Sequence, residues 1–298
     1  MRLGIDLGGT KIELIALASN GEELLRKRVP TPQGSYKNTL DAIISLVHNA
    51  ESALQEKGSL GIGIPGTLSP DHGYVKNANS TCLIGHNLKG DIESRLIREV
   101  RIANDADCFT LSEACDGAAA GAASVFGVII GTGVGGGIVI NQSLISGPNA
   151  ICGEWGHNPL PWQTQSDLPL SPCYCGKKGC IETYLSGPGF ERDYLSLSKE
   201  RRTAVDIVQH LNTDPYAHQS IERYINRLAR SLSTVINILD PDVIVMGGGM
   251  SNIDLIYQGV EKKWQNYVFS DKVNTKICKA LHGDSSGVRG AAWLWPQA

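Results

Sequence analysis

The sequence lacks several features that would place it in a specialised class of protein. Its 27 lysines and arginines nearly balance its 30 aspartates and glutamates, and there is no long run of one charge sign. Nothing therefore draws it electrostatically to nucleic acid or to a membrane. No apolar run approaches the length that spans a bilayer, and the first residues lack the basic start and apolar stretch of a signal peptide. We expect a cytoplasmic protein that acts on a small soluble molecule.

The sequence also lacks the regularly placed cysteines of a disulfide framework. Of its eight cysteines, Cys173, Cys175 and Cys180 crowd one short segment, and the other five are scattered among apolar or small residues. In a cytoplasmic chain this distribution favours a metal site and buried thiols. Three thiols need one more ligand to complete a tetrahedral zinc site, and His157 is the best candidate. Because protein would fill all four positions, such a zinc would be structural rather than catalytic.

What the chain does contain is an alternation of strand and helix signals along its 298 residues, a length sufficient for two lobes. Residues 3–7 and 12–18 predict two strands around a glycine turn, and residues 125–130 and 137–140 repeat that layout. This echo predicts a duplicated α/β architecture with a central cleft. The expected lobes are residues 1–117, completed by a C-terminal helix over 287–298, and residues 118–286.

The remaining pattern predicts further helices and strands. We expect a third strand ending near Val29, a helix capped by Ser35, and helices over 91–99 and 217–239. Further strands are predicted over 60–64, 100–103 and 243–246. Asn104 and Asp105 follow one of these strands, at the kind of strand end where ligands of open α/β sheets collect.

Three glycine-rich segments lie at predicted strand ends, where backbone amides could approach an anion. They are Asp6-Leu7-Gly8-Gly9-Thr10-Lys11, Gly131-Thr132-Gly133 and Gly247-Gly248-Gly249. Each match is weak by itself, because glycine turns are common. The second is a poor dinucleotide-binding fingerprint, since a strand rather than a helix follows it. In the first, the acid could hold magnesium and the hydroxyl could bond phosphate. Together the three segments indicate a nucleotide site.

On these residues the chain resembles the ROK family of sugar kinases and repressors. The segment from Asp6 to Lys11 looks like the family's first phosphate motif, Ile130-Gly131-Thr132-Gly133 like its second, and Gly247-Gly248-Gly249 like its adenosine-side loop. The family's zinc signature is similar to Glu154-Trp155-Gly156-His157 with Cys173-Tyr174-Cys175-Gly176 and Gly179-Cys180-Ile181-Glu182. The resemblance covers nearly the entire chain. It implies a two-lobed, actin-like ATPase fold of the ribonuclease H-like type.

The resemblance also implies an ATP-dependent sugar kinase that uses Mg²⁺, carries a structural Zn²⁺ and forms a homodimer. Asp105 would be the catalytic base, and Asp6 would help to position magnesium. Zinc would be bound by His157, Cys173, Cys175 and Cys180. The sugar would be held by Gly66, Asn79, Asn104, Asp105, Glu154, His157 and Glu182. ATP would be bound by Asp6, Gly8, Gly9, Thr10, Lys11, Gly131, Thr132, Gly133, Gly247, Gly248 and Gly249. In the family, the histidine places one ring nitrogen on zinc and the other toward the sugar.

The substrate is implied by three segments, over 75–81, 153–162 and 282–293. They look most like bacterial fructokinases of the mannofructokinase type, which implies conversion of fructose to fructose 6-phosphate. The alternative is an N-acetylglucosamine kinase, whose members share the Cys-x-Cys-Gly loop and a similar His-Gly-Asp tail. A sugar-responsive transcriptional regulator is disfavoured, because the phosphate motif begins at Asp6 and leaves no room before it for a helix-turn-helix domain.

Overall fold

The computed structural model describes residues 1–78 and 80–296, so the candidate sugar ligand Asn79 lies outside the described residues. The chain divides into two units. The first comprises Met1–Gly121, Gly137–Cys152 and Leu281–Ala298, and the second comprises Ala122–Gly136 and Gly153–Ala280. Among the described residues, no helix is both long and apolar enough to cross a membrane.

The first unit is organised around a five-stranded sheet of order β3-β2-β1-β4-β7. Its strands are β1 (Arg2–Leu7), β2 (Lys11–Leu17), β3 (Glu23–Pro30), β4 (Ser59–Ile64) and β7 (Val100–Asn104). β1 runs parallel to β4, and β4 runs parallel to β7. In this register Asp6 pairs with Gly63, and Ile64 pairs with Asn104. The carboxyl ends of β1 and β7 therefore lie at the same edge of the sheet, together with the residues that follow them.

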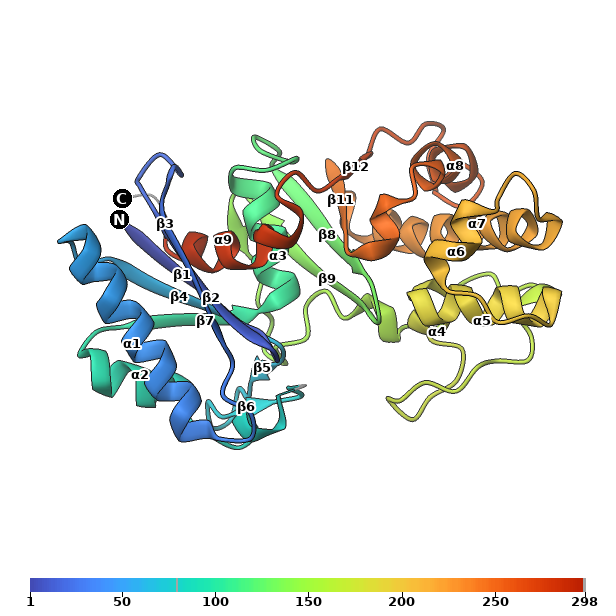
Figure 1. Cartoon of the computed structure of the whole chain (residues 1–298). Helices are drawn as coiled ribbons and strands as arrows, with labels where there is room; N and C mark the ends of the chain where they lie inside the picture. Colours follow the sequence, from blue (N-terminus) through green and yellow to red (C-terminus); the bar gives the residue numbers. More distant parts are fainter. Residues whose placement is uncertain (79, 297–298) are drawn as a thin grey trace. The chain divides into compact units, whose positions relative to one another are not determined.

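Helices cover both faces of this sheet (Figure 1). α1 (Tyr36–Leu54) and α2 (Leu88–Leu96) lie on one face, and α3 (Asp105–Cys115) and α9 (Ser286–Trp293) lie on the other. α1 begins where the sequence predicts, with the Ser35 hydroxyl accepting a hydrogen bond from the Asn38 amide at 3.3 Å. α2 begins and ends earlier than predicted. Asn87 caps its first turn, and Ile97 adopts a left-handed conformation with φ of 52° that ends it.

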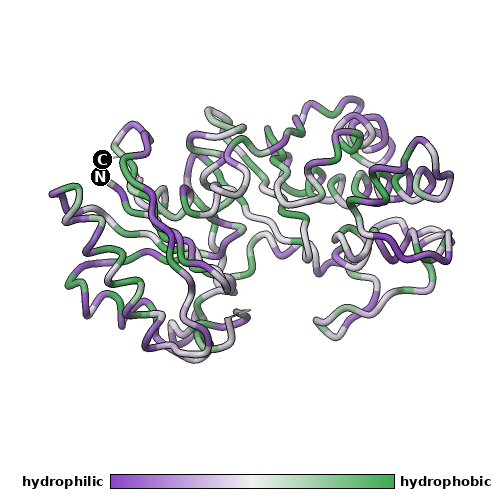
Figure 2. Tube along the Cα trace, viewed as in Figure 1, coloured by the Kyte–Doolittle hydropathy of each residue, from purple (hydrophilic) through white to green (hydrophobic). Residues whose placement is uncertain are grey.

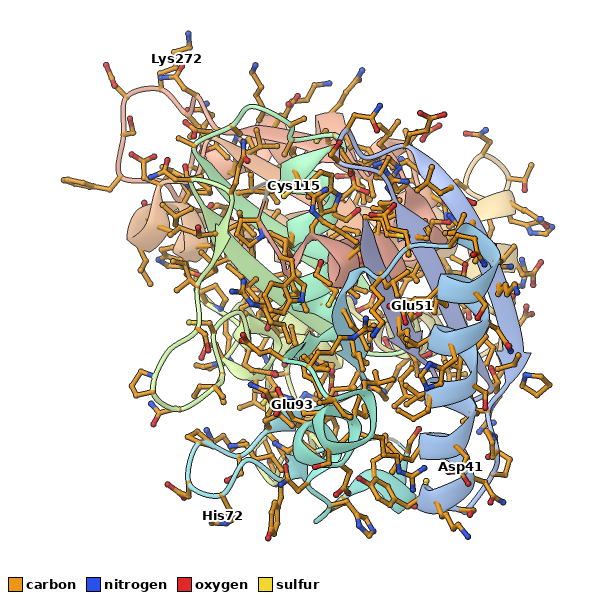
Figure 3. The ribbon with its side chains drawn as sticks, turned by 90° about the vertical axis from the view of Figure 1, so that its left-hand side faces the viewer. Asp41, Glu51, His72, Glu93, Cys115 and Lys272 are labelled. Carbon is orange, nitrogen blue, oxygen red and sulfur yellow. The ribbon has the colours of Figure 1, made fainter. Side chains whose placement is uncertain are left out.

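Ion pairs fasten α1 to the chain around α2. Asp41 and Glu51 lie on α1 (Figure 3), and they pair with Arg95 and Arg98, respectively. Beneath them, α1 contributes Leu40, Ile43 and Val47 to an apolar core shared with β1, β2 and β4. In Figure 2, apolar segments alternate with hydrophilic ones along the strands of this sheet and along α1.

The C-terminal helix α9 approaches the sheet and α3 through glycines. A Cβ added to Gly4 would lie 2.2 Å from the Val288 carbonyl oxygen, and one added to Gly61 would lie 1.8 Å from that of Ala291. A Cβ on Gly290 would lie 1.6 Å from the carbonyl oxygen of Cys108 in α3. Any side chain at these positions would therefore push α9 away. The smaller elements of the first unit are β5 (Thr67–Leu68), β6 (Val75–Lys76), η1 (Thr81–Leu83), β10 (Ser143–Leu144) and η5 (Gly283–Ser285).

The second sheet has the order β10-β9-β8-β11-β12. It contains β8 (Ser124–Ile130), β9 (Val134–Ile140), β11 (Val243–Gly247) and β12 (Lys276–Lys279). β9 begins earlier than the strand predicted over 137–140. Numbered along the chain within each sheet, both five-stranded sheets have the order 3-2-1-4-5, and in both the first, fourth and fifth strands run parallel. The duplication predicted from the sequence is therefore a duplication of sheet topology.

Helices are the main regular structure of the second unit outside its sheet. The long helix α7 (Pro215–Leu239) begins at the N-cap Asp214, with Pro215 in its first turn, and it packs against α5 (Gly187–Ser198) and α8 (Leu255–Trp264). The other helices are α4 (Glu182–Leu185), α6 (Ala204–Gln209), η2 (Trp155–His157), η3 (Gln165–Asp167) and η4 (Gly249–Asn252). Pattern alone predicted α7 but left the short helices α4, α5, α6 and α8 unplaced.

Candidate functional site

Asp105 is the first residue of α3, immediately beyond β7. Asn104 is the N-cap, and its side-chain oxygen accepts a hydrogen bond from the Ala106 amide at 2.8 Å. The side-chain amide of Asn104 donates to the Gly66 carbonyl at 3.0 Å. Both ends of the Asn104 side chain are thus held by backbone groups, and Gly66 lies against it. This local geometry fixes the position of the Asp105 backbone, and so the point from which its side chain extends.

The Asp105 side chain is exposed to solvent. Its Oδ1 accepts a hydrogen bond from the Ala106 amide at 2.8 Å. The surrounding protein removes water from the charged form and raises the pKa of Asp105, against the lowering effect of the Ala106 amide and the Asn104 side chain. Asp6, at the same edge of the sheet, is half-buried. Burial, then the charges of Asp105 and Glu13, raise the pKa of Asp6 to about 6. The charge of Asp105 therefore disfavours the ionised form of Asp6.

The first glycine turn joins β1 to β2 beside Asp6. The Gly8 amide donates to the Lys11 carbonyl at 3.0 Å, and Gly9 and Thr10 are exposed at the tip. The turn is held from outside by Thr31, whose hydroxyl donates to the Gly8 carbonyl at 2.7 Å. Lys11 pairs with the buried Glu13 at 3.3 Å. The turn presents backbone at an open surface, which suits an anion.

The second and third glycine segments lie together at one edge of the second sheet. β8 and β11 are parallel neighbours, with Ile129 paired to Gly247. Gly248 has φ of 80°, and a Cβ there would lie 2.4 Å from the Ile130 carbonyl oxygen. Only glycine fits this approach without strain. Nothing lies within 4 Å of a Cβ built on Gly249 or Gly131, so both are open.

Glu182 links the second glycine segment to the cysteine loop. Its Oε2 accepts a hydrogen bond from the Val134 amide at 3.0 Å and would lie 2.9 Å from a Cβ on Gly133. Its Oε1 lies 4.0 Å from the Sγ of Cys173. One carboxylate therefore contacts both the glycine turn before β9 and the thiol cluster, which places two groups of predicted site residues side by side within the second unit.

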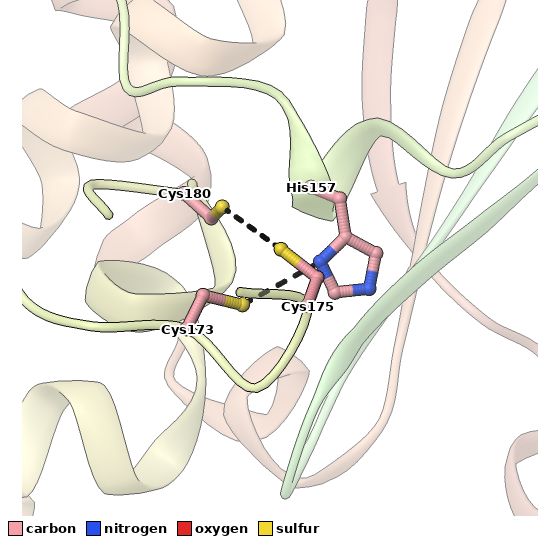
Figure 4. Close-up of side chains that lie close together, drawn as sticks. All are labelled: His157, Cys173, Cys175 and Cys180. Atoms are coloured by element: carbon pink, nitrogen blue, oxygen red, sulfur yellow. Dashed lines mark hydrogen bonds between the residues drawn. The ribbon is translucent and has the colours of Figure 1, made fainter. Parts of the chain in front are cut away.

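His157 and the three thiols form one cluster (Figure 4). All four potential ligand atoms lie within 4.8 Å of one another, and none of the cysteines is in a disulfide. The Sγ atoms of Cys175 and Cys180 are 3.6 Å apart, as are the Sγ of Cys173 and the Nδ1 of His157. A bridge between Pro159 and Cys180 aligns the histidine segment with the end of the cysteine loop.

These separations fit a tetrahedral metal. With Zn–S of about 2.3 Å and Zn–N of about 2.0 Å, ligand atoms of a tetrahedral site stand about 3.8 Å apart for S···S and about 3.5 Å for S···N. The two 3.6 Å separations match two edges of that tetrahedron, and the remaining ones are at most 4.8 Å. The free ring nitrogen of His157, Nε2, lies 2.9 Å from the hydroxyl of Tyr174. The nitrogen that the resemblance assigns to sugar thus has a tyrosine partner here.

Glu154, three residues before His157, is exposed and is held in place through its neighbours. The indole nitrogen of Trp155 donates to the Gly135 carbonyl at 2.9 Å. A Cβ on Gly156 would lie 2.4 Å from the Val134 carbonyl oxygen, so this segment packs closely on the start of β9. The structure thus brings Glu154, His157 and Glu182 into one neighbourhood of the second unit.

Comparison with known proteins shows the family to which the chain belongs. The family model described as ROK family matches residues 2–298. The chain belongs to the ROK family. N-acetyl-D-glucosamine kinases of Yersinia pseudotuberculosis serotype IB (strain PB1/+) and Vibrio cholerae serotype O1 are 43% and 42% identical to it over 299 residues. The alignments cover 99% of this chain in both cases, and 98% and 99% of the respective relatives.

Solved ROK structures share the fold. The ROK hexokinase from Thermus thermophilus superposes with a TM-score of 0.87 at 27% identity, over 98% of this chain and 97% of that one. A ROK family glucokinase from Streptomyces griseus, in complex with glucose and AMPPNP, has a TM-score of 0.75 at 26% identity, over 100% and 99% of the chains. The resemblance to ROK sugar kinases and the two-lobed, actin-like ATPase fold that it implied are therefore confirmed.

Sequence reasoning missed some residues that shape this ROK site. It predicted Asn104 as a sugar ligand but did not predict it as the N-cap of α3. An asparagine followed by acidic residues in the next turn, as in Asn104-Asp105-Ala106-Asp107, is nevertheless a usual helix start. It did not find Thr31, which holds the first glycine turn. It also missed Gly287, where a Cβ would lie 3.7 Å from the Asp6 carboxyl carbon. The last two are distant in sequence, and no local signal marks them.

Proposed function

We propose that this ROK protein is an ATP-dependent hexose kinase in which Asp105 accepts the proton of the attacking sugar hydroxyl. The observation that carries the proposal is the placement of Asp105. It is an exposed carboxylate with a raised pKa at the start of α3, beside the oriented Asn104 and coupled to Asp6. A positioned base of this kind contributes about 10²–10⁴ to the rate of proton transfer.

The phosphate chemistry is supported by the glycine turns. Phosphoryl transfer depends chiefly on positioning and on stabilising negative charge, which backbone amides and cations supply. In this proposal the amides around Gly8, Gly9 and Gly133 bind phosphate oxygens, with Thr10, Lys11, Gly131 and Thr132, and the Gly247–Gly249 segment borders the adenosine. Asp6 suits Mg²⁺, which prefers oxygen ligands. Because burial and the charge of Asp105 disfavour the ionised form of Asp6, a bound cation would stabilise that form.

The sugar is held, in this proposal, by groups that accept or donate hydrogen bonds to hydroxyls. Asn104 and the Gly66 carbonyl contribute in the first unit, and Glu154, His157 and Glu182 in the second. Zinc bound by His157, Cys173, Cys175 and Cys180 would be structural, because protein fills its four positions. When bound, it ties the histidine segment to the loop that precedes Glu182.

The acceptor that we propose first is N-acetylglucosamine. Two relatives that carry this activity in their names align over almost their whole length at 42–43% identity. Fructose is the second candidate, because residues 75–81, 153–162 and 282–293 resemble fructokinases. The two candidates differ in whether the pocket must accommodate an acetamido group, so kinetics with both sugars separates them.

A single assay tests the function and the acceptor. ADP release, coupled to NADH oxidation, would be measured with N-acetylglucosamine, fructose, mannose and glucose at equal concentrations. The proposal requires kcat/KM for one hexose to exceed the others by at least tenfold, and the highest value identifies the acceptor. Sugar-independent ADP release with every hexose would contradict the kinase assignment. Sedimentation at several protein concentrations would test the homodimer, which we propose by analogy with the family.

A further inference from the structure

A polar cavity of about 300 Å³ lies in the second unit, on one face of the long helix α7. Arg223, Arg227 and Arg230 line it together with Lys263 from α8, and the acids among its lining residues are Asp167 and Glu222. None of the candidate catalytic, ATP-binding or metal-binding residues is among those that line it. The volume is sufficient for a small metabolite.

Much of the cavity lining comes from one face of α7. Gln219, Arg223, Asn226 and Arg230 recur every three or four residues, so they share one face of α7. Most faces that pack inside a protein are apolar, yet every residue lining this cavity is polar or charged. A face of this kind binds a polar partner or water rather than another apolar element.

Its two innermost arginines are buried and rigidly held. Arg227 is 4% exposed and donates from Nε to Asp167 at 2.8 Å and from Nη1 to Asp193 at 2.7 Å. Arg230 is 1% exposed and donates from Nη2 to Asp167 at 3.0 Å. Burial opposes the charge of Asp167, but the Thr164 amide and the two arginines lower the pKa of Asp167 and keep it ionised. The guanidinium planes are therefore fixed before any ligand arrives.

Hydrogen-bonding capacity remains unused in this buried frame. Among the described residues, the Nε of Arg230 is buried and has no hydrogen-bond partner. Burying this donor without a partner is costly, which favours an internal water or a small movement of the surrounding side chains that gives it one. Arg223 and Lys263 at the rim are partly exposed, and their acidic partners lie at 3.6 and 3.1 Å. Such cations can turn toward a ligand anion.

We propose that this cavity binds a small phosphate-bearing polyol of the hexose phosphate class. The arginines and Lys263 supply charge-assisted donors for a phosphate, which arginine recognises through its planar fork. Gln219, Asn226 and Ser166 supply amide and hydroxyl groups of the kind that bind sugar hydroxyls. An apolar ligand would offer no counter-charge to the partly exposed cations Arg223 and Lys263.

The arginines of the cavity also hold the backbone of the segment between His157 and Cys173. Arg230 donates from Nη1 to the carbonyls of Pro161 and Trp162 at 3.0 and 2.5 Å, and Arg227 donates from Nη2 to the Ser166 carbonyl at 3.1 Å. These buried side chains thus hold the backbone that joins His157 to the cysteine loop. A ligand bound to the same guanidinium groups stiffens that segment, and amide hydrogen exchange can report the effect.

The test is calorimetric titration of the intact protein with a hexose 6-phosphate, with inorganic phosphate and with the free hexose. A saturating non-hydrolysable ATP analogue and acceptor sugar would occupy the kinase site, so the outcome does not depend on the proposed activity. We expect saturable binding of the hexose phosphate, weaker binding of phosphate and none of the hexose. Exchange should slow over residues 161–167 and 219–230. Absence of binding at 10 mM, or protection only elsewhere, would overturn the proposal.

Variants locate the ligand. Exchanging both rim cations, Arg223→Gln with Lys263→Gln, should weaken binding at least tenfold, and Gln219→Glu should weaken it by adding an anion to the exposed wall. The matched control exchanges one exposed arginine and one exposed lysine of the same unit, Arg201→Gln with Lys272→Gln. Equal affinity of the hexose phosphate for the rim variants and for the control would overturn the proposal. A protein that binds inorganic phosphate but not the hexose phosphate would overturn it as well.

Discussion

The negative charge of Asp105 reinforces burial in raising the pKa of Asp6 to about 6. An acid from a distant part of the sequence thus opposes the ionisation of Asp6 at one edge of the first sheet. The unfolded chain ionises Asp6 at its ordinary pKa of about 3.8. The charged form therefore destabilises the fold above about pH 6, and this effect disappears below about pH 3.8, where both states are protonated.

Asp6→Asn should therefore stabilise the protein while impairing catalysis. The shift of about two pKa units corresponds to at most about 3 kcal/mol, and solvent screening reduces it. We expect the melting temperature at pH 8 to rise by about 2–6 °C, with no rise near pH 4. Thermal melts at both pH values measure this, and ADP release should fall because the proposed Mg²⁺ ligand is lost. A variant that melts lower at pH 8 would contradict the coupling.

Asp105→Asn should keep the hydrogen bond to the Ala106 amide but remove the proton acceptor. We expect kcat to fall by about 10²–10⁴, with the KM for the sugar changed by less than about threefold. Steady-state kinetics with the preferred hexose measures both constants. Asp71→Asn, an exposed acid in the same unit, is the matched control and should retain activity. Near-normal turnover in Asp105→Asn would refute the base assignment.

Cys180→Ser should release metal from the cluster. One thiol fewer leaves the tetrahedral set incomplete, so we expect zinc content to fall below about 0.2 per chain, from about one. Elemental analysis after dialysis measures this, and the KM for the sugar should rise because the loop before Glu182 loses its anchor. Cys152→Ser, outside the cluster, should keep its zinc. Full zinc content in the Cys180 variant would exclude the proposed ligand set.

Gly290→Ala should destabilise the first unit. The added methyl would lie 1.6 Å from the Cys108 carbonyl, which is backbone and cannot rotate away. Overpacking of this kind costs about 1–3 kcal/mol or more, despite the higher helix propensity of alanine. Gly287→Ala is the control on the same helix, because its methyl meets Asp6 at an ordinary 3.7 Å. Urea unfolding of both should show a loss of stability only for Gly290→Ala.

Features that depend on neighbouring residues, such as helix caps and short strands, were predicted well from the sequence. Ser35 was expected to cap a helix, and it does, because a hydroxyl can satisfy a free amide within its own first turn. The predicted strands β1, β2 and β11 are present because each has a short apolar pattern that needs no distant information. The bounds of one helix were predicted wrongly: Asn87 caps α2, which therefore begins before the helix predicted over 91–99.

The sequence by itself determined the glycine turns, the cysteine cluster and the two-fold repeat of strands, since each depends on residues close together in the chain. Only the tertiary structure decided that Asp6 meets Asp105, that α9 enters a glycine-lined slot, and that Arg227 and Arg230 share Asp167. These relationships join residues roughly 60 or more positions apart. They depend on how parallel strands align and how helices pack on them, and neither is encoded in any single segment.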